Sequence, residues 1–372
     1  MREAAIFRHN LFKVSEPFIT AQAGHLRRTR PFYLGRLRYG APPQGAEALA
    51  LRDRFSWPRI GWQMLSRDPA LYLRLLGGRR PTLIHAHFGI EGVYALPLAR
   101  ALGVPLVTTF HGFDATLSDA ALLASPAWFN YPLYRRRLAR DGDLFIAASF
   151  FIRQRLLALG FPEQRIRVHY IGVDCEGVRP RDPAEETPTI LHVARLVEVK
   201  GTEYLIRAFA QLPARHRDAT LTIIGDGPLR RRLERLAASL GVASRIRFPG
   251  SLPHDDVLAH MRKAAMLVLP SVTTQSGRVE GLGMVLLEAA ARGVPAIGSR
   301  SGGIPEGIAD GETGFLVPEC DPVALAGRMA DLLDDAALRA RMGSAARAMI
   351  ERRFDIRTQS DMLEAYYDAL LA

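Results

Sequence analysis

The chain has 372 residues, 48% of them hydrophobic, so it can bury a large core and is long enough for two domains. Its formal charge of +11 favours an anionic partner such as nucleic acid, anionic lipid or a phosphorylated ligand, although arginine used for solubility alone gives the same excess. It lacks nucleic-acid-binding signatures. With only Cys175 and Cys320 it has no disulfide framework, and it lacks a signal peptide, so a cytoplasmic protein is predicted. No apolar run reaches about 18 residues, so no transmembrane helix is predicted.

The first half of the chain alternates apolar runs with helical segments. Residues 41–60 are rich in Pro, Gly and Ala and are expected to be irregular, and residues 61–76 show a weak amphipathic pattern broken at Pro69. Strands that alternate with helices predict a parallel, doubly wound sheet. The expected strands lie at 4–7, 31–34, 81–87, 104–112, 144–149 and 165–171, with a helix at 89–102.

A segment rich in Pro and charge at 176–188 predicts a linker between a first domain, 1–175, and a second domain, 189–355. A last helix within 356–372 is expected to pack back on the first domain. Two Rossmann-like sheets facing each other across a cleft are therefore predicted, with ligands at the carboxyl ends of the strands. In the second domain, strands are expected at 189–194, 219–225, 245–248, 265–269, 295–299 and 314–317, and helices at 201–211, 229–240, 254–264, 284–292, 321–334 and 336–352.

The stretch from Pro270 to Pro318 contains a loop-to-helix junction suited to anion binding. An apolar strand is followed by a polar loop and by Glu280-Gly-Leu-Gly-Met284, where a helix is expected to begin. The first turn of a helix presents unpaired N–H groups and the positive end of its dipole to an anion. Glu280 and Glu288 flank this junction, which suggests that the anion carries hydroxyl groups.

Two cations follow the first strand of the second domain. Arg195 comes just after this strand and Lys200 comes at the opening of the next helix, so together they can clamp a diphosphate. The alternative is that both are surface charges of an arginine-rich chain. A second strand-to-helix turn, Gly225-Asp-Gly-Pro228, allows close backbone approach and is either structural or part of a binding site.

Histidines dominate the candidate residues of the first domain. His111 directly follows a strand and is expected to face the cleft, although a lone histidine is more often structural. His85 and His87 point to one face of the preceding strand, but no carboxylate or Cys completes a metal site, so no metal is expected. Asp141-Gly-Asp143 matches a cation-binding pattern of some sugar transferases, yet it precedes its strand and predicts a turn.

Taken together, these motifs resemble the retaining glycosyltransferases of the GT-B fold, family GT4. In the first domain, Leu83-Ile-His-Ala-His-Phe-Gly89, Phe110-His-Gly-Phe-Asp114 and the opening loop Ser15-Glu-Pro-Phe-Ile19 are similar to the exopolysaccharide (colanic acid and amylovoran) branch. The opening loop departs from the Gly-Gly loop with which many GT4 enzymes approach the donor diphosphate. The second-domain motifs are Arg195…Lys200-Gly201, Gly225-Asp-Gly-Pro228, Glu280-x₇-Glu288 and Ser301-Gly-Gly-Ile-Pro-Glu306…Asp310-Gly…Gly314-Phe-Leu-Val.

The resemblance implies a nucleotide-diphosphate sugar as donor, held mainly by the second domain, with UDP favoured and no cofactor or metal. Glu288 would bind the ribose hydroxyls, Arg195 and Lys200 the diphosphate, and Glu280 the hydroxyls of the donor sugar. His111 would lie against the sugar from across the cleft. The remaining donor contacts would come from Gly227, from Leu252 near the base, and from the backbone of Gly281, Leu282, Gly283 and Met284.

Three other enzyme classes compete with a transferase. A glycoside hydrolase also uses two carboxylates, but if both glutamates were helical they would lie roughly 12 Å apart along the axis, too far to flank one bond. A NAD dehydrogenase would need a third glycine after Gly225-Asp-Gly227. A nucleotide-sugar epimerase shares the architecture, and both it and a GDP-mannose-using transferase stay open.

The acceptor is expected to be a glycan or a polyprenyl-diphosphate-linked oligosaccharide used in polysaccharide biosynthesis. All three tryptophans, Trp57, Trp62 and Trp128, lie in the first domain, and residues 127–137 mix aromatic side chains with a basic run. This composition suits peripheral contact with the anionic inner face of a membrane. The alternative is an ordinary helix with a solvated arginine face.

Overall fold

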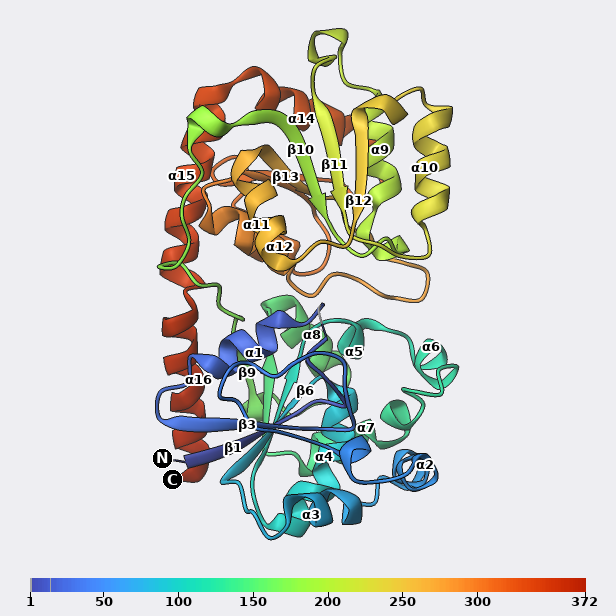
Figure 1. The fold of residues 1–372 in the computed structure, drawn as a ribbon, viewed down its shortest axis with the longest axis vertical. Helices are drawn as coiled ribbons and strands as arrows, with labels where there is room; N and C mark the ends of the chain where they lie inside the picture. Colours follow the sequence, from blue (N-terminus) through green and yellow to red (C-terminus); the bar gives the residue numbers. More distant parts are fainter. Residues whose placement is uncertain (1, 14) are drawn as a thin grey trace. The chain divides into compact units, whose positions relative to one another are not determined.

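The computed structural model describes residues 2–13 and 15–372, and the chain divides into two compact units (Figure 1). The first unit comprises Met1–Gly172 together with Ile356–Ala372, and the second comprises Val173–Asp355. The predicted linker at 176–188 thus counts with the second unit, where a 3₁₀ turn (Pro183–Glu185) leads directly into the first strand of that unit.

The first unit is built on a parallel seven-stranded sheet with the order β5-β3-β1-β6-β7-β8-β9. A separate two-stranded parallel sheet pairs β2 (Asn10–Leu11) with β4 (Leu37–Arg38) beyond the carboxyl ends of β1 and β3. The strands of the main sheet are β1 (Arg2–Phe7), β3 (Thr29–Gly35), β5 (Ala48–Ala50), β6 (Leu83–His87), β7 (Leu106–Phe110), β8 (Leu144–Ala147) and β9 (Ile166–Val168). The helices are α1 (Pro17–Gly24), α2 (Trp57–Ser66), α3 (Ala70–Leu76), α4 (Gly89–Leu102), α5 (Phe113–Thr116), α6 (Asp119–Leu123), α7 (Asn130–Asp141), α8 (Phe150–Ala158) and α16 (Ile356–Leu371).

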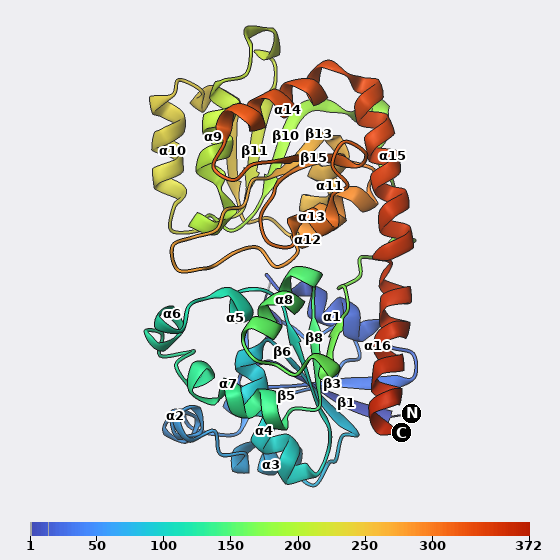
Figure 2. The same ribbon diagram turned by 180° about the vertical axis from the view of Figure 1, so that it is seen from behind.

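Helix α16, although last in the chain, is part of the first unit (Figure 2). Its Leu363 and Tyr367 pack into one apolar cluster with side chains of β1, β6, β7 and β8. The buried Glu364 carboxylate accepts hydrogen bonds from the backbone N–H groups of Arg27 and Arg28 at 3.1 and 2.8 Å. The helix therefore completes one side of the first sheet.

The second unit has a parallel six-stranded sheet with the order β12-β11-β10-β13-β14-β15. Alternate residues of β13 enter different apolar clusters: Met266 and Val268 pack on one face of the sheet, Leu267 and Leu269 on the other. Both faces are covered, as in a doubly wound fold. The strands are β10 (Thr187–Val193), β11 (Thr220–Ile224), β12 (Ile246–Gly250), β13 (Ala264–Leu269), β14 (Ala296–Ser299) and β15 (Gly314–Val317). The helices are α9 (Thr202–Ala210), α10 (Arg230–Ser239), α11 (His254–Lys263), α12 (Met284–Ala291), α13 (Ile304–Gly307), α14 (Pro322–Asp334) and α15 (Ala336–Arg353).

The prediction of two parallel Rossmann-like sheets is confirmed, while the irregular structure predicted for residues 41–60 holds for 41–47 and is wrong for most of 48–60. That segment contains β5, a 3₁₀ turn (Leu51–Asp53) and the start of α2. Strand β5 has only three residues and forms because it pairs with β3 at the edge of the sheet. Such a short edge strand leaves little periodic signal in the sequence.

Candidate active site

The carboxyl edge of the second sheet brings together the predicted donor-site residues. Lys200, in a 3₁₀ turn after β10, forms an ion pair with Glu280, which lies in the loop after β13. The Ser271 hydroxyl donates a second, longer hydrogen bond to the same carboxylate oxygen at 3.4 Å. Residues 80 positions apart thus meet above the sheet. Since Glu280 precedes α12, the helical spacing used to argue against a hydrolase does not apply.

A third cation, Arg278, lies in this cluster and was missed by sequence reasoning. Burial lowers the pKa of its guanidinium, the positive charge of Arg195 lowers it further, and the Glu280 carboxylate raises it. Arg195 itself is exposed, and among the described residues its side chain has no ion-pair partner. Three cations and one carboxylate leave two positive charges in the cluster formed by Arg195, Lys200, Arg278 and Glu280. That excess matches the charge of a diphosphate.

Close backbone contacts hold these loops in place. Gly201 has φ +63°, and a Cβ on it would lie 1.8 Å from the carbonyl oxygen of Pro270, so the Lys200 loop lies directly against the end of β13. The Val272 N–H donates to the Val199 carbonyl at 2.9 Å across the same contact. A Cβ on Gly303 would lie 2.0 Å from the carbonyl oxygen of Gly281. The loops after β10, β13 and β14 therefore form one packed layer.

Helix α12 begins at Met284, as predicted, directly after this layer. Gly283 takes φ +82° at its N-cap, and the buried Leu282 precedes it. Glu288 lies one turn further along α12, where burial raises the pKa of its carboxyl and the nearby charges of His254 and Arg292 lower it. The half-buried Glu288 side chain therefore lies near His254 at the start of α11, one turn into the helix whose N-terminus follows Glu280.

Gly227 and Leu252 have structural roles in the second unit. A Cβ on Gly227 would lie 2.5 Å from the carbonyl oxygen of Leu196, and the Leu196 N–H donates to the Asp226 carbonyl at 2.9 Å. The Gly225-Asp-Gly turn is thus fastened to the loop that carries Arg195. Leu252, after β12, packs against the apolar cluster beneath α11. These contacts account for both residues without a ligand, and their donor contacts stay predictions.

In the first unit, His85, His87 and His111 form a row of stacked rings at the carboxyl ends of β6 and β7. The His85 and His87 ring centroids lie 4.5 Å apart, and His87 Nδ1 is 3.0 Å from His111 Nε2. Both nitrogens of His85 are used, by the hydroxyls of Tyr367 (2.5 Å) and Thr109 (2.6 Å). Burial, followed by neighbouring positive groups, holds the pKa of all three imidazoles well below the usual range. The row is therefore neutral at physiological pH.

Asp114 fixes the position of His111. Its carboxylate accepts from the backbone N–H groups of Gly89, His111 and Gly112 at 2.8–3.2 Å, and burial raises its pKa to about 6 against the lowering effect of these hydrogen bonds. His111 Nδ1 is buried and has no hydrogen-bond partner in the described part of the chain. The Nδ1 of His111 is thus a buried polar atom that the described residues leave unsatisfied. Contact of His111 with a donor held by the second unit stays a prediction.

No cluster of three or more His, Cys, Asp or Glu side chains within residues 2–13 and 15–372 has the arrangement of a metal site. Asp143 accepts a hydrogen bond from the Leu106 N–H at 2.9 Å, which places it at the amino end of β7, and Asp141 pairs with Arg140. These two carboxylates are therefore occupied by local contacts at the edge of the sheet opposite to His111.

Within the predicted membrane-facing segment, 127–137, Trp128 and Arg135 are engaged by contacts within the first unit, while Leu133 is 60% exposed. The half-buried Trp128 packs against Phe113, with ring centroids 5.1 Å apart, and Arg135 pairs with Asp119. Helix α2 buries Ile60 but exposes both of its tryptophans and Leu65: Trp57 is 53% exposed, Trp62 65% and Leu65 62%. Within the described residues, no helix combines the length and apolar character needed to cross a bilayer.

Comparison with known proteins assigns the family. The family model for glycosyl transferases group 1 matches residues 178–349, and that for glycosyltransferase family 4 matches residues 31–176. A GDP-mannose-dependent alpha-(1-6)-phosphatidylinositol monomannoside mannosyltransferase of Mycolicibacterium smegmatis is 33% identical over 314 residues, covering 78% of this chain and 79% of the relative. The chain belongs to the family 4, group 1 glycosyltransferases.

Two further relatives are consistent with this assignment. The putative colanic acid biosynthesis glycosyltransferase WcaL of Escherichia coli is 37% identical over 256 residues, which cover 68% of this chain and 61% of WcaL. The crystal structure of Anabaena HepE in complex with UDP and glucose superposes with a TM-score of 0.80 at 20% identity, covering 99% of this chain and all of that one. This glycosyltransferase thus has the GT-B fold, and the resemblance read from its motifs is confirmed.

Proposed function

We propose that this glycosyltransferase moves a sugar from a nucleotide-diphosphate sugar to a glycan or polyprenyl-diphosphate-linked acceptor, with retention at the anomeric carbon and without a metal ion. A UDP-sugar is the favoured donor, and polysaccharide biosynthesis is the setting. The names of WcaL and of an amylovoran transferase from Erwinia amylovora support the setting, and the UDP bound to HepE supports the donor.

The observation that carries the proposal is the cation cluster of Arg195, Lys200 and Arg278 at the start of α12. As the bond between the anomeric carbon and the diphosphate breaks, negative charge develops on the leaving oxygen. Cations and helix N–H groups that are already in place stabilise this charge with little reorganisation. Two net positive charges suffice for a diphosphate, which is the physical reason to expect no metal.

The carboxylates of the site fit binding better than acid–base chemistry. Glu280 is paired with Lys200. Its carboxylate is therefore suited to accept hydrogen bonds from the hydroxyls of the donor sugar, rather than to attack the anomeric carbon or to transfer a proton. Glu288 is proposed to accept the ribose hydroxyls and His111 to contact the transferred sugar. No protein nucleophile is assigned, and a diphosphate oxygen is proposed to take the proton of the acceptor hydroxyl on the same face.

Peripheral membrane association is proposed through α2 rather than through residues 127–137. Trp57, Trp62 and Leu65 are exposed on one helix, and the Arg52 guanidinium lies 5.4 Å from the Trp57 ring centroid. Aromatic side chains beside arginines suit an interface with anionic lipid headgroups. Sedimentation with vesicles of anionic phospholipid should pull down the wild type at low salt, and a Trp57→Ser/Trp62→Ser variant should stay in solution. Equal sedimentation of both proteins would count against this surface.

A thermal-shift screen tests the donor. Ligands that bind the native state raise the apparent unfolding temperature by mass action, so UDP, GDP and their sugars are compared at equal concentration, with and without EDTA. A shift with UDP-sugars that survives EDTA is expected, and no shift with any nucleotide would overturn the proposal. GDP-mannose is the second candidate donor because the mycobacterial relative is named as GDP-mannose-dependent. Epimerised donor formed without acceptor would favour the epimerase alternative.

A further inference from the structure

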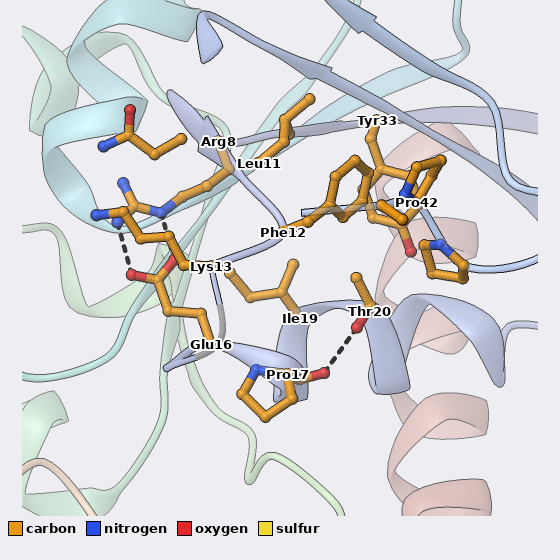
Figure 3. Close-up of a pocket in the computed structure, with 13 residues that line it drawn as sticks. Arg8, Leu11, Phe12, Lys13, Glu16, Pro17, Ile19, Thr20, Tyr33 and Pro42 are labelled. Carbon is orange, nitrogen blue, oxygen red and sulfur yellow. Dashed lines mark hydrogen bonds and ion pairs between the residues drawn. The ribbon is translucent and has the colours of Figure 1, made fainter. Parts of the chain in front are cut away.

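A cavity of about 260 Å³ lies in the first unit, beyond the carboxyl ends of β1 and β3 (Figure 3). One end is polar, with Lys13 and Glu16, and the other is apolar, with Phe12, Tyr33 and Pro42 (Figure 3). Asn10 also lines the cavity. Ligand sites combine apolar walls with a few polar groups in this way, and they usually measure about 300–1,000 Å³ for drug-sized ligands. The cavity therefore suits one small ring rather than an extended chain.

The wall of the cavity is built at a conformational cost. Phe12 has φ +61°, in the left-handed region that bulky side chains rarely adopt. A Cβ on Gly40 would lie 2.8 Å from the Phe12 carbonyl oxygen, and the Tyr39 N–H donates to the Leu11 carbonyl at 3.0 Å, so the β2–β4 sheet holds Phe12 in place. Its ring packs edge-on against Tyr33, with centroids 5.0 Å apart. Backbone strain of this kind clusters at functional sites.

The cavity carries one uncompensated positive charge. Of the three charged side chains that line the cavity, Arg8 forms a two-pronged ion pair with Glu16 at 2.8 and 2.9 Å, which leaves the charge of Lys13. Arg8 also contacts the buried Glu91, which does not line the cavity. Lys13 has no carboxylate partner in the described residues, and its Nζ lies 5.8 Å from the Tyr39 ring centroid. The chain has 46 arginines but only three lysines. A compact ammonium group at this position is thus a departure from the arginine that this chain uses elsewhere.

The polar end of the cavity lies near His111. The Arg8 guanidinium lies 4.4 Å from the Phe88 ring centroid, and the Phe88 and His111 rings are 4.6 Å apart. Phe18 of α1, the helix that lines the cavity, also contacts His111 with centroids 5.0 Å apart. A single layer of aromatic side chains therefore separates the cavity from the histidine proposed to contact the transferred sugar.

We propose that this cavity binds the acceptor, and that the bound part is one sugar ring carrying a single anionic group. The apolar C–H face of the ring would pack on Phe12, Tyr33 and Pro42, and its hydroxyls would reach Asn10 and Glu16. Lys13 would pair with the anionic group, a carboxylate on the sugar or a phosphate attached to it. The inference rests on the proposed transferase function, for which it names the acceptor class.

Three probes test the cavity: methyl β-D-glucuronoside, glucose 1-phosphate and the neutral methyl β-D-glucoside. Binding is measured by ligand-observed NMR with the full chain, while saturating UDP or GDP occupies the donor site. The wild type should bind at least one anionic probe about tenfold or more tightly than the neutral one, as for an added charge-assisted contact. The two anionic probes separate a carboxylate from a phosphate.

Two substitutions at Lys13 and one control make the test specific. Lys13→Met should remove the preference for the anionic probe, and Lys13→Arg should restore part of it. Lys263→Met, which removes an exposed lysine of the second unit, is the matched control and should behave as wild type. Equal affinity of wild type and Lys13→Met for the anionic probe would overturn the inference, as would the absence of any probe binding. A Lys13→Met protein that loses nucleotide affinity would instead place Lys13 in the donor site.

Nucleotide binding distinguishes the two proposals. If UDP or GDP binds but no anionic probe does, the acceptor assignment fails and the donor site stands. If neither nucleotide binds, the proposed UDP- or GDP-sugar donor is wrong, and probe binding at Lys13 would then mark a sugar site without support for the acceptor role.

Discussion

Replacing Gly303 by alanine tests whether the packed loop layer of the second unit positions the donor site. Gly303 has φ −88°, a conformation open to alanine, so the substitution adds a methyl group without backbone strain. That methyl carbon would lie 2.0 Å from the carbonyl oxygen of Gly281. The Gly303 N–H also donates to the Glu280 carbonyl at 3.1 Å, so a displacement here reaches Glu280 directly.

The size of the displacement follows from the contact. Ordinary van der Waals contact of a Cβ begins at 3.4 Å, so the two loops must separate by 3.4 − 2.0 = 1.4 Å unless the strain is shared. A shift of about 1 Å in a positioned group can lower an enzymatic rate by about 10²-fold. We therefore expect kcat/KM of Gly303→Ala to fall by about 10²-fold, with a smaller loss of affinity for the nucleotide diphosphate, because Arg195 lies on a different loop.

Gly327→Ala is the matched control. Gly327 lies within α14 with open space around it, so a methyl group there should leave kcat/KM unchanged and stabilise the helix by about 1 kcal/mol. Rates are measured as release of nucleoside diphosphate, affinity by calorimetry, and folding by thermal unfolding. A Gly303→Ala protein that unfolds at the wild-type temperature and keeps kcat/KM within threefold would refute the positioning role of the loop contact.

Three more outcomes are expected. Glu280→Gln removes the carboxylate that pairs with Lys200. Calorimetry should then show UDP binding roughly fivefold more tightly, about 1 kcal/mol, while turnover falls. Weaker UDP binding would contradict the pairing. Because burial raises the pKa of Glu288, nucleotide affinity should weaken on acidification at a higher pH than for an ordinary glutamate, and Glu288→Gln should flatten this dependence; equal pH profiles would count against the ribose role. Finally, the first unit should be acid-sensitive. Its buried histidines have a lowered pKa and stay neutral in the folded state, whereas the same histidines bind protons in the unfolded state. The free energy of unfolding should therefore fall as the pH drops below about 6.5, by up to about 1.4 kcal/mol per pH unit for each such histidine. Fluorescence reports this unit alone, since it holds all three tryptophans, and a urea midpoint unchanged between about pH 7 and pH 5 would refute the expectation. The histidines concerned are His9, His85, His87, His111 and His169.

The fold could be predicted because buried parallel strands are apolar on both faces and end at Gly or Pro. Strand β13 was expected at 265–269 and spans Ala264–Leu269, and β15 was expected at 314–317 and spans Gly314–Val317. Helices with a clear start, such as α12 after Gly283, were placed to within a residue. Where an element depends on a distant partner, as β5 depends on β3, the local sequence carried too little information.

The candidate site was only partly predictable, because its central contacts join distant parts of the chain. Lys200 and Glu280 were assigned separate ligands, and nothing in their spacing indicated that they pair with each other. Arg278 was overlooked because one arginine among 46 carries no signal until its burial beside Arg195 is known. Likewise Trp57 and Trp128 look alike in sequence, yet one is exposed and the other packs against Phe113.

The Lys200–Glu280 pair also bears on how the site would discriminate between a donor and its spent nucleotide. A diphosphate alone must draw Lys200 away from Glu280 and leaves that carboxylate with only the long hydrogen bond from Ser271, in a partly buried loop, which costs free energy. A nucleotide sugar supplies both replacements at once, phosphate oxygens for Lys200 and hydroxyl donors for Glu280. On the proposed roles, the pair therefore favours the intact donor over the product diphosphate and speeds product release. Glu280→Gln should then abolish this preference, because UDP would bind more tightly and leave more slowly. The same variant would thus show both the higher affinity for UDP and the lower turnover.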